Sequence, residues 1–297
     1  MSSQTPELLV AGSVALDTRD GPFGKVEEDL GGSAVYFALA ASLILPVKVA
    51  APVGRDGAER VARAFEGRAI DTTLVQVIDA PTYRWRARQE HGRNIDLGSS
   101  DQIYDVWEPV VPPDFAGWAF VGSMRPDRQA QVMKMLSSAQ LLAADAMLSY
   151  MYERPSETTD VLGRASWFFC NQEEFDALGG HDVEEFRRRW WLDGVVVKAG
   201  AGGATAYTAD GSVHAPALTS RIALDTTGAG DALAGGMLAS WLSTGAERSG
   251  LFNALVCGVA CASLAIESIG IRGISTATTT LLEERKAEVI ECLRRAS

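Results

Sequence analysis

The 297-residue chain has few cysteines and few histidines, which limits the metal and disulfide chemistry open to it. Its four cysteines form no CxxC pair, so we expect a reduced, cytoplasmic protein without a disulfide framework. Cys257 and Cys261 lie four residues apart in an apolar run, which indicates packed core thiols. The three histidines lie far apart in the sequence, so a zinc site or a Ser-His-Asp triad is disfavoured.

Positive charge is also scarce. Lysine and arginine number 27 against 38 acidic residues, a net charge of -11, whereas a nucleic-acid binder needs a basic surface. The first ten residues lack a basic segment and include Glu7, so we expect no secretory signal. Residues 249–266 carry no charge over a membrane-span length, but Asn253 and Gly258 interrupt them. We therefore expect a buried core helix, with neither nucleic acid nor membrane as a partner.

Two common nucleotide-binding motifs are missing. GxxxxGK[ST] does not occur, which excludes a P-loop, and the glycines at 200–203 do not form a GxGxxG turn that opens a helix. Hydrophobic residues make up 47% of the chain, enough for a large core. The length favours a single α/β domain over residues 1–297.

Short apolar runs that end in turn or polar residues alternate with helical segments. This order is typical of a mostly parallel, doubly wound sheet with helices on both faces. The expected strands are 8–12, 47–53, 73–78, 118–121, 140–144, 167–170 and 194–198, with a hairpin over 204–215. The expected helices are 33–45, 58–67, 127–137, 172–178, 230–242, 247–266 and 281–294.

Residues 81–108 depart from this order and read as an insertion. Within them, Arg84, Arg86 and Arg88 alternate on one face of a two-faced strand. A polar, turn-rich stretch follows at 90–101. The arginine face either meets an anionic acceptor or is simply solvated.

Ligands of open parallel sheets bind beyond the carboxyl ends of the strands. The strongest candidate there is the segment Asp225-Thr226-Thr227-Gly228-Ala229-Gly230-Asp231, which leads into a long apolar helix. Its small residues let a ligand approach the backbone, and the free amides of a helix start favour an anion. Asp231 would repel a phosphate there unless it takes a proton from a hydroxyl that attacks phosphorus. The alternative is an acidic residue that merely favours the helix start.

Residues 225–239, DTTGAGDALAGGMLA, resemble the C-terminal signature of the ribokinase-like (PfkB) family of sugar and nucleoside kinases. Weaker resemblances follow in the family's order: Gly12 with Asp17, Gly31–Ala34, Val53–Asp56, the NxxE motif Asn171–Glu174, and the turn Lys198–Gly203. The resemblance implies an α/β ribokinase-like fold with a small β lid, formed here by about 14–30 and 72–110. A lid with exposed edges would pair across a two-fold axis, so we expect a homodimer.

The resemblance also implies ATP-dependent transfer of the γ-phosphoryl group to a hydroxyl of a small sugar. Asp231 would be the base, and the amides of Gly228, Ala229 and Gly230 would form the anion hole. Asn171 and Glu174 would organise Mg²⁺ through water, unless they only form a helix cap with its capping-box partner. The acceptor side would comprise Asp17, Gly31, Gly32 and Ser33.

The nucleotide side implied by the resemblance includes Lys198, Gly200, Gly203, Thr226 and Asn253. Salt bridging is the alternative for Lys198, and a polar position within the core is the alternative for Asn253. Two further residues match positions that hold a monovalent cation in many relatives, so potassium is admitted without being required. These two residues are Asp225 and Thr227.

The acceptor stays open at this point. Many ribose-directed relatives carry Asn in the helix after the Gly-Gly pair, where this chain has Val35, Tyr36 and Phe37. These side chains either make the pocket more apolar and aromatic or pack the core. A nucleoside or an anionic sugar derivative is therefore an alternative to a sugar. A non-catalytic relative that senses nucleotide or sugar is the alternative of another class, and Asp231 with the NxxE motif argues against it.

Overall fold

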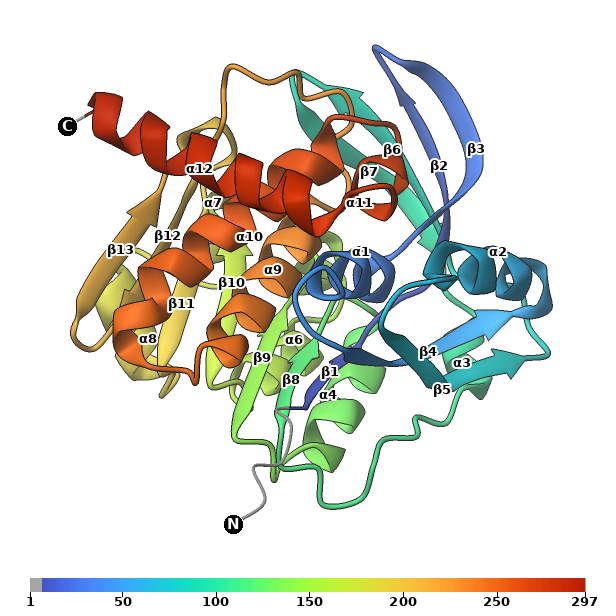
Figure 1. The fold of residues 1–297 in the computed structure, drawn as a ribbon. Coiled ribbons are helices and arrows are strands. Elements are labelled where there is room, and N and C mark those ends of the chain that lie inside the picture. The colour runs from blue at the N-terminus through green and yellow to red at the C-terminus, as the bar shows by residue number, and fades with distance from the viewer. Residues whose placement is uncertain (1–6, 297) are drawn as a thin grey trace.

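The computed structural model describes residues 7–296, so residues 1–6, and with them most of the segment tested for a secretory signal, lie outside the described residues. A nine-stranded sheet forms the centre of the molecule, in the order β13-β12-β11-β10-β9-β8-β1-β4-β5 (Figure 1). Neighbours from β5 to β11 pair in parallel, and β12 and β13 extend the sheet in antiparallel fashion. The strands are β1 Leu8–Ala11, β4 Val47–Gly54, β5 Ile70–Ile78, β8 Trp118–Val121, β9 Leu141–Asp145, β10 Trp167–Asn171, β11 Gly194–Lys198, β12 Ala204–Thr208 and β13 Gly211–Ala215.

Helices cover both faces of this sheet, as the alternating pattern predicts. Leu8 and Val10 of β1 belong to one hydrophobic core, and Leu9 and Ala11 belong to the other, because successive side chains of a strand point to opposite faces. On the first face lie α1 Ser33–Ala41, α2 Arg55–Phe65, α9 Ala229–Ser243, α10 Leu251–Ile266, α11 Arg272–Ser275 and α12 Thr279–Ala296. On the second lie α3 Ile103–Val106, α4 Pro126–Met135, α5 Leu148–Glu153, α6 Pro155–Leu162, α7 Gln172–Ala177 and α8 Val183–Arg189.

The apolar helix α10 packs within the first core. Among the described residues, 248–266 form the single helix long and apolar enough to cross a membrane, and 67% of that window is buried. Glycines bring α9 and α10 close together: a Cβ on Gly236 would lie 2.6 Å from the Cys261 sulfur. The prediction of a buried core helix with packed thiols is confirmed.

A second, four-stranded sheet stands at the carboxyl-end side of the large one, in the order β3-β2-β6-β7 (Figure 1). Its strands are β2 Ala15–Gly21, β3 Gly24–Gly31, β6 Arg84–Glu90 and β7 Arg93–Ser100. This is the expected small lid.

The second lid segment is shorter than expected, and the prediction of 72–110 is wrong at both ends. β5 is an edge strand of the large sheet, and α3 packs in the hydrophobic core on the second face of that sheet. The stretch 90–101, read as turns, contains β7, most of whose residues are exposed. The sequence of β7 shows no alternation of apolar and polar residues, because neither face of the strand is fully buried.

Candidate active site

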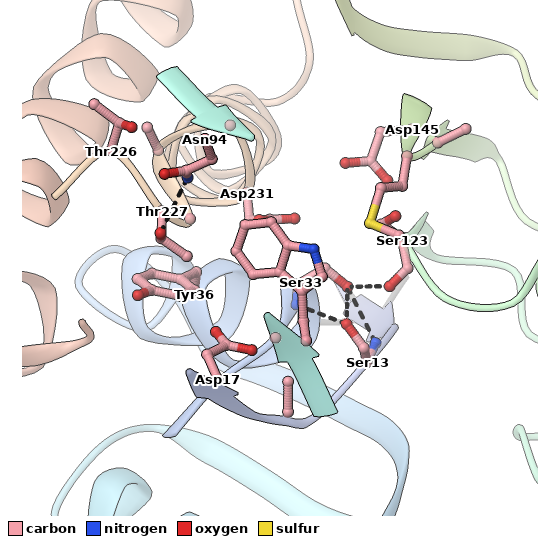
Figure 2. A pocket seen from close by; sticks show the side chains of 18 of the residues that line it. Ser13, Asp17, Ser33, Tyr36, Asn94, Ser123, Asp145, Thr226, Thr227 and Asp231 are labelled. Atoms are coloured by element: carbon pink, nitrogen blue, oxygen red, sulfur yellow. Dashed lines mark hydrogen bonds between the residues drawn. The ribbon is translucent and has the colours of Figure 1, made fainter. Parts of the chain in front are cut away.

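A cavity of about 270 Å³ lies where the carboxyl ends of the large sheet meet the lid. Ser13, Ser123 and Asp145 line it just after β1, β8 and at the end of β9. The lid contributes Asp17, Trp85, Asn94 and their neighbours. Figure 2 shows Asp17, Tyr36 and Asp231 around this space. The position agrees with the rule that open α/β sheets bind ligands beyond their strand ends.

The bend before α9 lines the cavity with backbone rather than with large side chains. Gly228 has a φ of 74°, and a Cβ there would lie 2.2 Å from the ring of Tyr36. Glycine is therefore required by conformation and by space. Gly230 faces Lys198, whose Nζ would lie 2.8 Å from an added Cβ. The amide of Ala229 makes a long contact of 3.4 Å to the Thr226 carbonyl, so the bend presents a weakly engaged helix start to the cavity.

Asp231 lies in the first turn of α9 and lines the cavity instead of packing away from it. Its Oδ1 is buried and has no hydrogen-bond partner among residues 7–296. Burial raises the pKa of Asp231 to about 6, against the attraction of Lys198, which lowers it. Such a carboxylate is ionised at neutral pH and can still accept a proton.

Opposite charges gather where β10 and β11 end at the cavity. Asn171 and Glu174 form the predicted capping box, with Glu174 N to Asn171 Oδ1 at 2.8 Å and Asn171 N to Glu174 Oε2 at 2.7 Å. Lys198 Nζ lies 4.0 Å from Glu174 Oε2. Burial would lower the pKa of Lys198, but Glu174, Asp145 and Asp231 outweigh it and raise that pKa. Both readings of Lys198, ion pairing and a place at the site, thus agree with the structure.

This end of the cavity can accommodate a divalent cation. Burial and then the charge of Asp231 raise the pKa of Asp145 well above its ordinary value, and Asp145 Oδ1 has no partner within the described residues. An added cation would relieve this excess of negative charge. Among residues 7–296, no group of three or more His, Cys, Asp or Glu side chains could hold a metal ion by itself. The donor set therefore suits Mg²⁺ that keeps several waters.

On the lid side of the cavity, Asp17 projects from β2 with its Oδ1 unpartnered among the described residues. Burial raises the pKa of Asp17 to about 7, although Arg19 lowers it. The hydroxyl of Tyr36 is likewise buried and has no partner in residues 7–296. Gly32 and Ser33 also line the cavity, whereas Gly31 leaves room for Asp17: its Cβ would lie 2.1 Å from Asp17 Oδ2.

The structure decides between the two interpretations of the arginine face on β6. Trp85 lines the cavity, but Arg84, Arg86 and Arg88 do not, because neighbouring residues of a strand point to opposite faces. Arg84 instead pairs with Glu28 at 2.9 Å. The arginines therefore do not meet an acceptor in this cavity.

Other predicted residues divide between the cavity and its surroundings. Thr226 and Thr227 line it, whereas Asp225 is buried beside it. Gly200 and Asn253 are exposed outside the cavity, and Gly203 is buried outside it. Of the three residues in α1 where ribose-directed relatives carry Asn, Tyr36 lines the cavity, and Val35 and Phe37 pack in the core.

Several lining residues are not among those predicted from the sequence. Ser13, Ser123 and Asp145 lie directly after apolar strands, which is a signal that could have identified them. Trp85 and Asn94 come from the inner face of the lid, and no local pattern announces their role. Tyr83, Met147 and Tyr150 complete the lining.

Comparison with known proteins agrees with this geometry. Residues 16–278 match the pfkB family carbohydrate kinases. The chain is 28% identical to an ATP-dependent ribose-1-phosphate kinase of Halopiger xanaduensis. The aligned 239 residues cover 77% of this chain and 78% of the relative. The chain is 25% identical to a cytidine kinase of Thermococcus kodakarensis. The aligned 252 residues cover 79% of this chain and 88% of the relative.

A solved structure shows the same fold. The nucleoside kinase of Burkholderia thailandensis, in complex with inosine, superposes with a TM-score of 0.79 at 18% identity, over 96% of this chain and 99% of that one. The family uses ATP and transfers phosphate to an alcohol group of a sugar or a nucleoside. The chain belongs to the pfkB family of carbohydrate kinases.

Proposed function

We propose that this protein transfers the γ-phosphoryl group of ATP to a hydroxyl of an uncharged sugar, with Asp231 as the general base. The main support is the Asp231 carboxylate, which lines the cavity beside the glycine bend and whose Oδ1 is buried and has no hydrogen-bond partner among residues 7–296. Asp231 would take the proton as the hydroxyl oxygen attacks the γ-phosphorus. Its pKa of about 6 keeps it ionised at neutral pH.

The amides of Gly228, Ala229 and Gly230 would bind the phosphoryl oxygens as charge develops on them. Lys198 would neutralise the same region from β11. Bound Mg²⁺ would supply further positive charge to the phosphate oxygens. Asn171 and Glu174 would hold it through water, as the excess negative charge around Asp145 favours.

The cavity favours a neutral acceptor over an anionic sugar derivative. Asp17 brings a carboxylate to the acceptor side, with Tyr36 and Asn94 as further polar groups. Among the described residues, Lys198 is the single positively charged side chain that lines the cavity. An anionic group away from the reacting hydroxyl would be buried without a cation, which is costly. Hydroxyl groups can instead donate to Asp17.

A nucleoside is the second candidate acceptor. Tyr83, Trp85 and Tyr150 line the cavity together with Met147. Aromatic rings of this kind can stack on a base, which is worth about 1–3 kcal/mol per base. The cytidine kinase and the inosine-bound nucleoside kinase among the relatives support this alternative.

ADP release from Mg·ATP tests the acceptor with three matched compounds: ribose, inosine and ribose 1-phosphate. We expect the better neutral compound to exceed ribose 1-phosphate in kcat/KM by about tenfold or more, which corresponds to about 1.4 kcal/mol. A higher value for ribose 1-phosphate would overturn the neutral acceptor. The ratio of inosine to ribose decides between nucleoside and free sugar, and the Asp231→Asn variant controls for contaminating kinases.

The nucleotide would extend from the bend toward Gly200, Gly203 and Asn253, with Thr226 beside its phosphates. Thr226 lines the cavity and the other three residues lie outside it, so we propose that the adenosine extends beyond the cavity. Substitution of Asn253 by a bulky residue should raise the KM for ATP without changing the acceptor KM. Equal KM values for ATP would remove Asn253 from the nucleotide site.

We further propose a cytoplasmic homodimer that pairs through the lid. β7 is an edge strand, and on it Ile95 and Leu97 are 44% and 46% exposed. Apolar side chains beside an open edge favour pairing with a second copy. Light scattering of the wild type and of a variant with Ile95 changed to Lys would show a dimer and a monomer, respectively.

A further inference from the structure

Arg19 of β2 is a buried guanidinium with no assigned role in the phosphoryl transfer. It is 2% exposed and does not line the cavity. Its Nη2 lies 2.8 Å from Asp29 Oδ2, and its Nη1 bonds to Asp225 Oδ2. Asp225 is the first residue of the bend that ends at Asp231, and its side chain is 1% exposed. A charge buried to this extent needs a defined partner.

Both oxygens of the Asp225 carboxylate already accept hydrogen bonds. Its Oδ2 accepts from Arg19 and from the amide of Gly270 at 2.9 Å, and its Oδ1 accepts from the amide of Thr227 at 3.0 Å. The hydroxyl of Thr227 in turn accepts from Asn94 Nδ2 at 3.1 Å. Asp225 and Thr227 therefore do not fit a monovalent cation as they stand, because their side-chain oxygens already accept hydrogen bonds and the Arg19 guanidinium already brings positive charge to Asp225.

Arg19 is also one of three lid side chains that hold the bend. Gln89 of β6 donates to the Leu224 carbonyl at 3.2 Å and accepts from the Thr226 amide at 3.4 Å. Asn94 of β7 reaches Thr227, as Figure 2 shows. Arg19 is the charged member of this set. Through Asp225 and the Thr227 amide it acts on the backbone directly before Gly228.

We propose that Arg19 is a positioning residue that permanently supplies the positive charge beside the bend, so that the enzyme works without potassium. Arg19 touches neither the acceptor nor the phosphates in this proposal; it fixes Asp225, and Asp225 fixes the amides that receive the phosphoryl group. The proposal rests on the proposed phosphoryl transfer and departs from the potassium site that the family resemblance admits.

The first test measures the wild-type rate in buffers that contain potassium, sodium or only tetramethylammonium, at equal ionic strength. We expect kcat values within about twofold, since the guanidinium is always charged. A wild-type enzyme that is active in potassium and inactive in tetramethylammonium would overturn the proposal while leaving the proposed function intact. Failure of the proposed function would instead appear as no phosphoryl transfer in any of the salts.

The second test removes the charge. Arg19→Met keeps much of the side-chain length but leaves Asp225 without its cation, so we expect kcat to fall about tenfold or more; removal of an oxyanion-hole donor itself costs about 10²–10³-fold. The KM for the acceptor should change little, and potassium should restore part of the rate, which a merely structural role would not explain. An unchanged kcat in a folded Arg19→Met variant would refute the positioning role.

Two further variants test the role of Arg19 if Arg19→Met does not fold. Arg19→Lys retains a positive charge beside Asp225, so it should retain more activity than Arg19→Met and remain insensitive to potassium. Asp29→Asn removes the second partner of Arg19 but leaves its bond to Asp225, and it should keep kcat within about threefold, as expected for a partly exposed pair. Potassium dependence of Arg19→Lys, or a large loss of kcat in Asp29→Asn, would contradict the proposal.

Discussion

Replacement of Asp231 by Asn should make the protein more stable and nearly inactive. Asn resembles the neutral acid in shape, so it keeps the packing and removes the base. A lost general base lowers kcat by about 10²–10⁴-fold. The pKa of Asp231 is raised from 3.8 to about 6, so holding its charge in the folded state costs about 3 kcal/mol. Asn avoids that cost.

The pH dependence gives the sign of this effect. Because the folded pKa lies above the unfolded one, the wild type loses stability as the pH rises from about 4 to about 6, and Asp231→Asn does not. The gain in unfolding free energy should therefore grow from about 1.5 kcal/mol at pH 5 to about 3 kcal/mol at pH 8.

Urea unfolding at the two pH values, together with ADP release at pH 8, measures both effects. The exposed loop residue Asp114 offers a matched control, since Asp114→Asn should change neither stability nor rate. An Asp231→Asn variant that is less stable than the wild type at pH 8, or one that retains its turnover, would contradict the role assigned to Asp231. In the first case the residue would be structural, and in the second another group would be the base.

Three further predictions concern the same cavity. Gly228→Ala should abolish turnover and lower the free energy of unfolding by about 2–4 kcal/mol, because its Cβ would meet the ring of Tyr36. Gly230→Ala should change the free energy of unfolding by no more than about 1 kcal/mol, because its Cβ would meet only the flexible end of Lys198. Equal unfolding midpoints for the two variants would contradict this contrast. The rate should rise with pH to a plateau above about 6 as Asp231 ionises, and a rate that is flat between pH 5 and pH 7 would exclude it as the base. Glu174→Gln should raise the Mg²⁺ concentration for half-maximal rate, and an identical magnesium titration would count against its metal role.

The large sheet could be predicted closely because its strands are buried on both sides. Such strands are nearly continuous apolar runs, and the run 194–198 coincides with β11. The bend at 225–231 could also be predicted, because Gly228 is required there by its positive φ and by the nearby ring of Tyr36. Both signals are local in sequence.

The lid was harder to predict because its strands depend on partners distant in sequence. β7 is mostly exposed, so no apolar alternation marks it, and β5 gives no sign of the sheet to which it belongs. The alternating arginines of β6 correctly predicted a strand, but they lie on its outer face, whereas Trp85 on the inner face lines the cavity. The contact of Arg19 with Asp225 spans 206 residues and could not be inferred from spacing.

A single-turnover experiment shows whether Asp231 is the base of the phosphoryl transfer. Wild type and Asp231→Asn are each mixed in excess with Mg·ATP labelled on its γ-phosphate, in the presence of the acceptor that the ADP assay identifies, and the fate of the label is followed. We predict that the wild type transfers the label to the acceptor within one turnover, and that Asp231→Asn binds the nucleotide but transfers at least about 100-fold more slowly. Transfer by Asp231→Asn at the wild-type rate, or label that passes to water in the wild type, would contradict it.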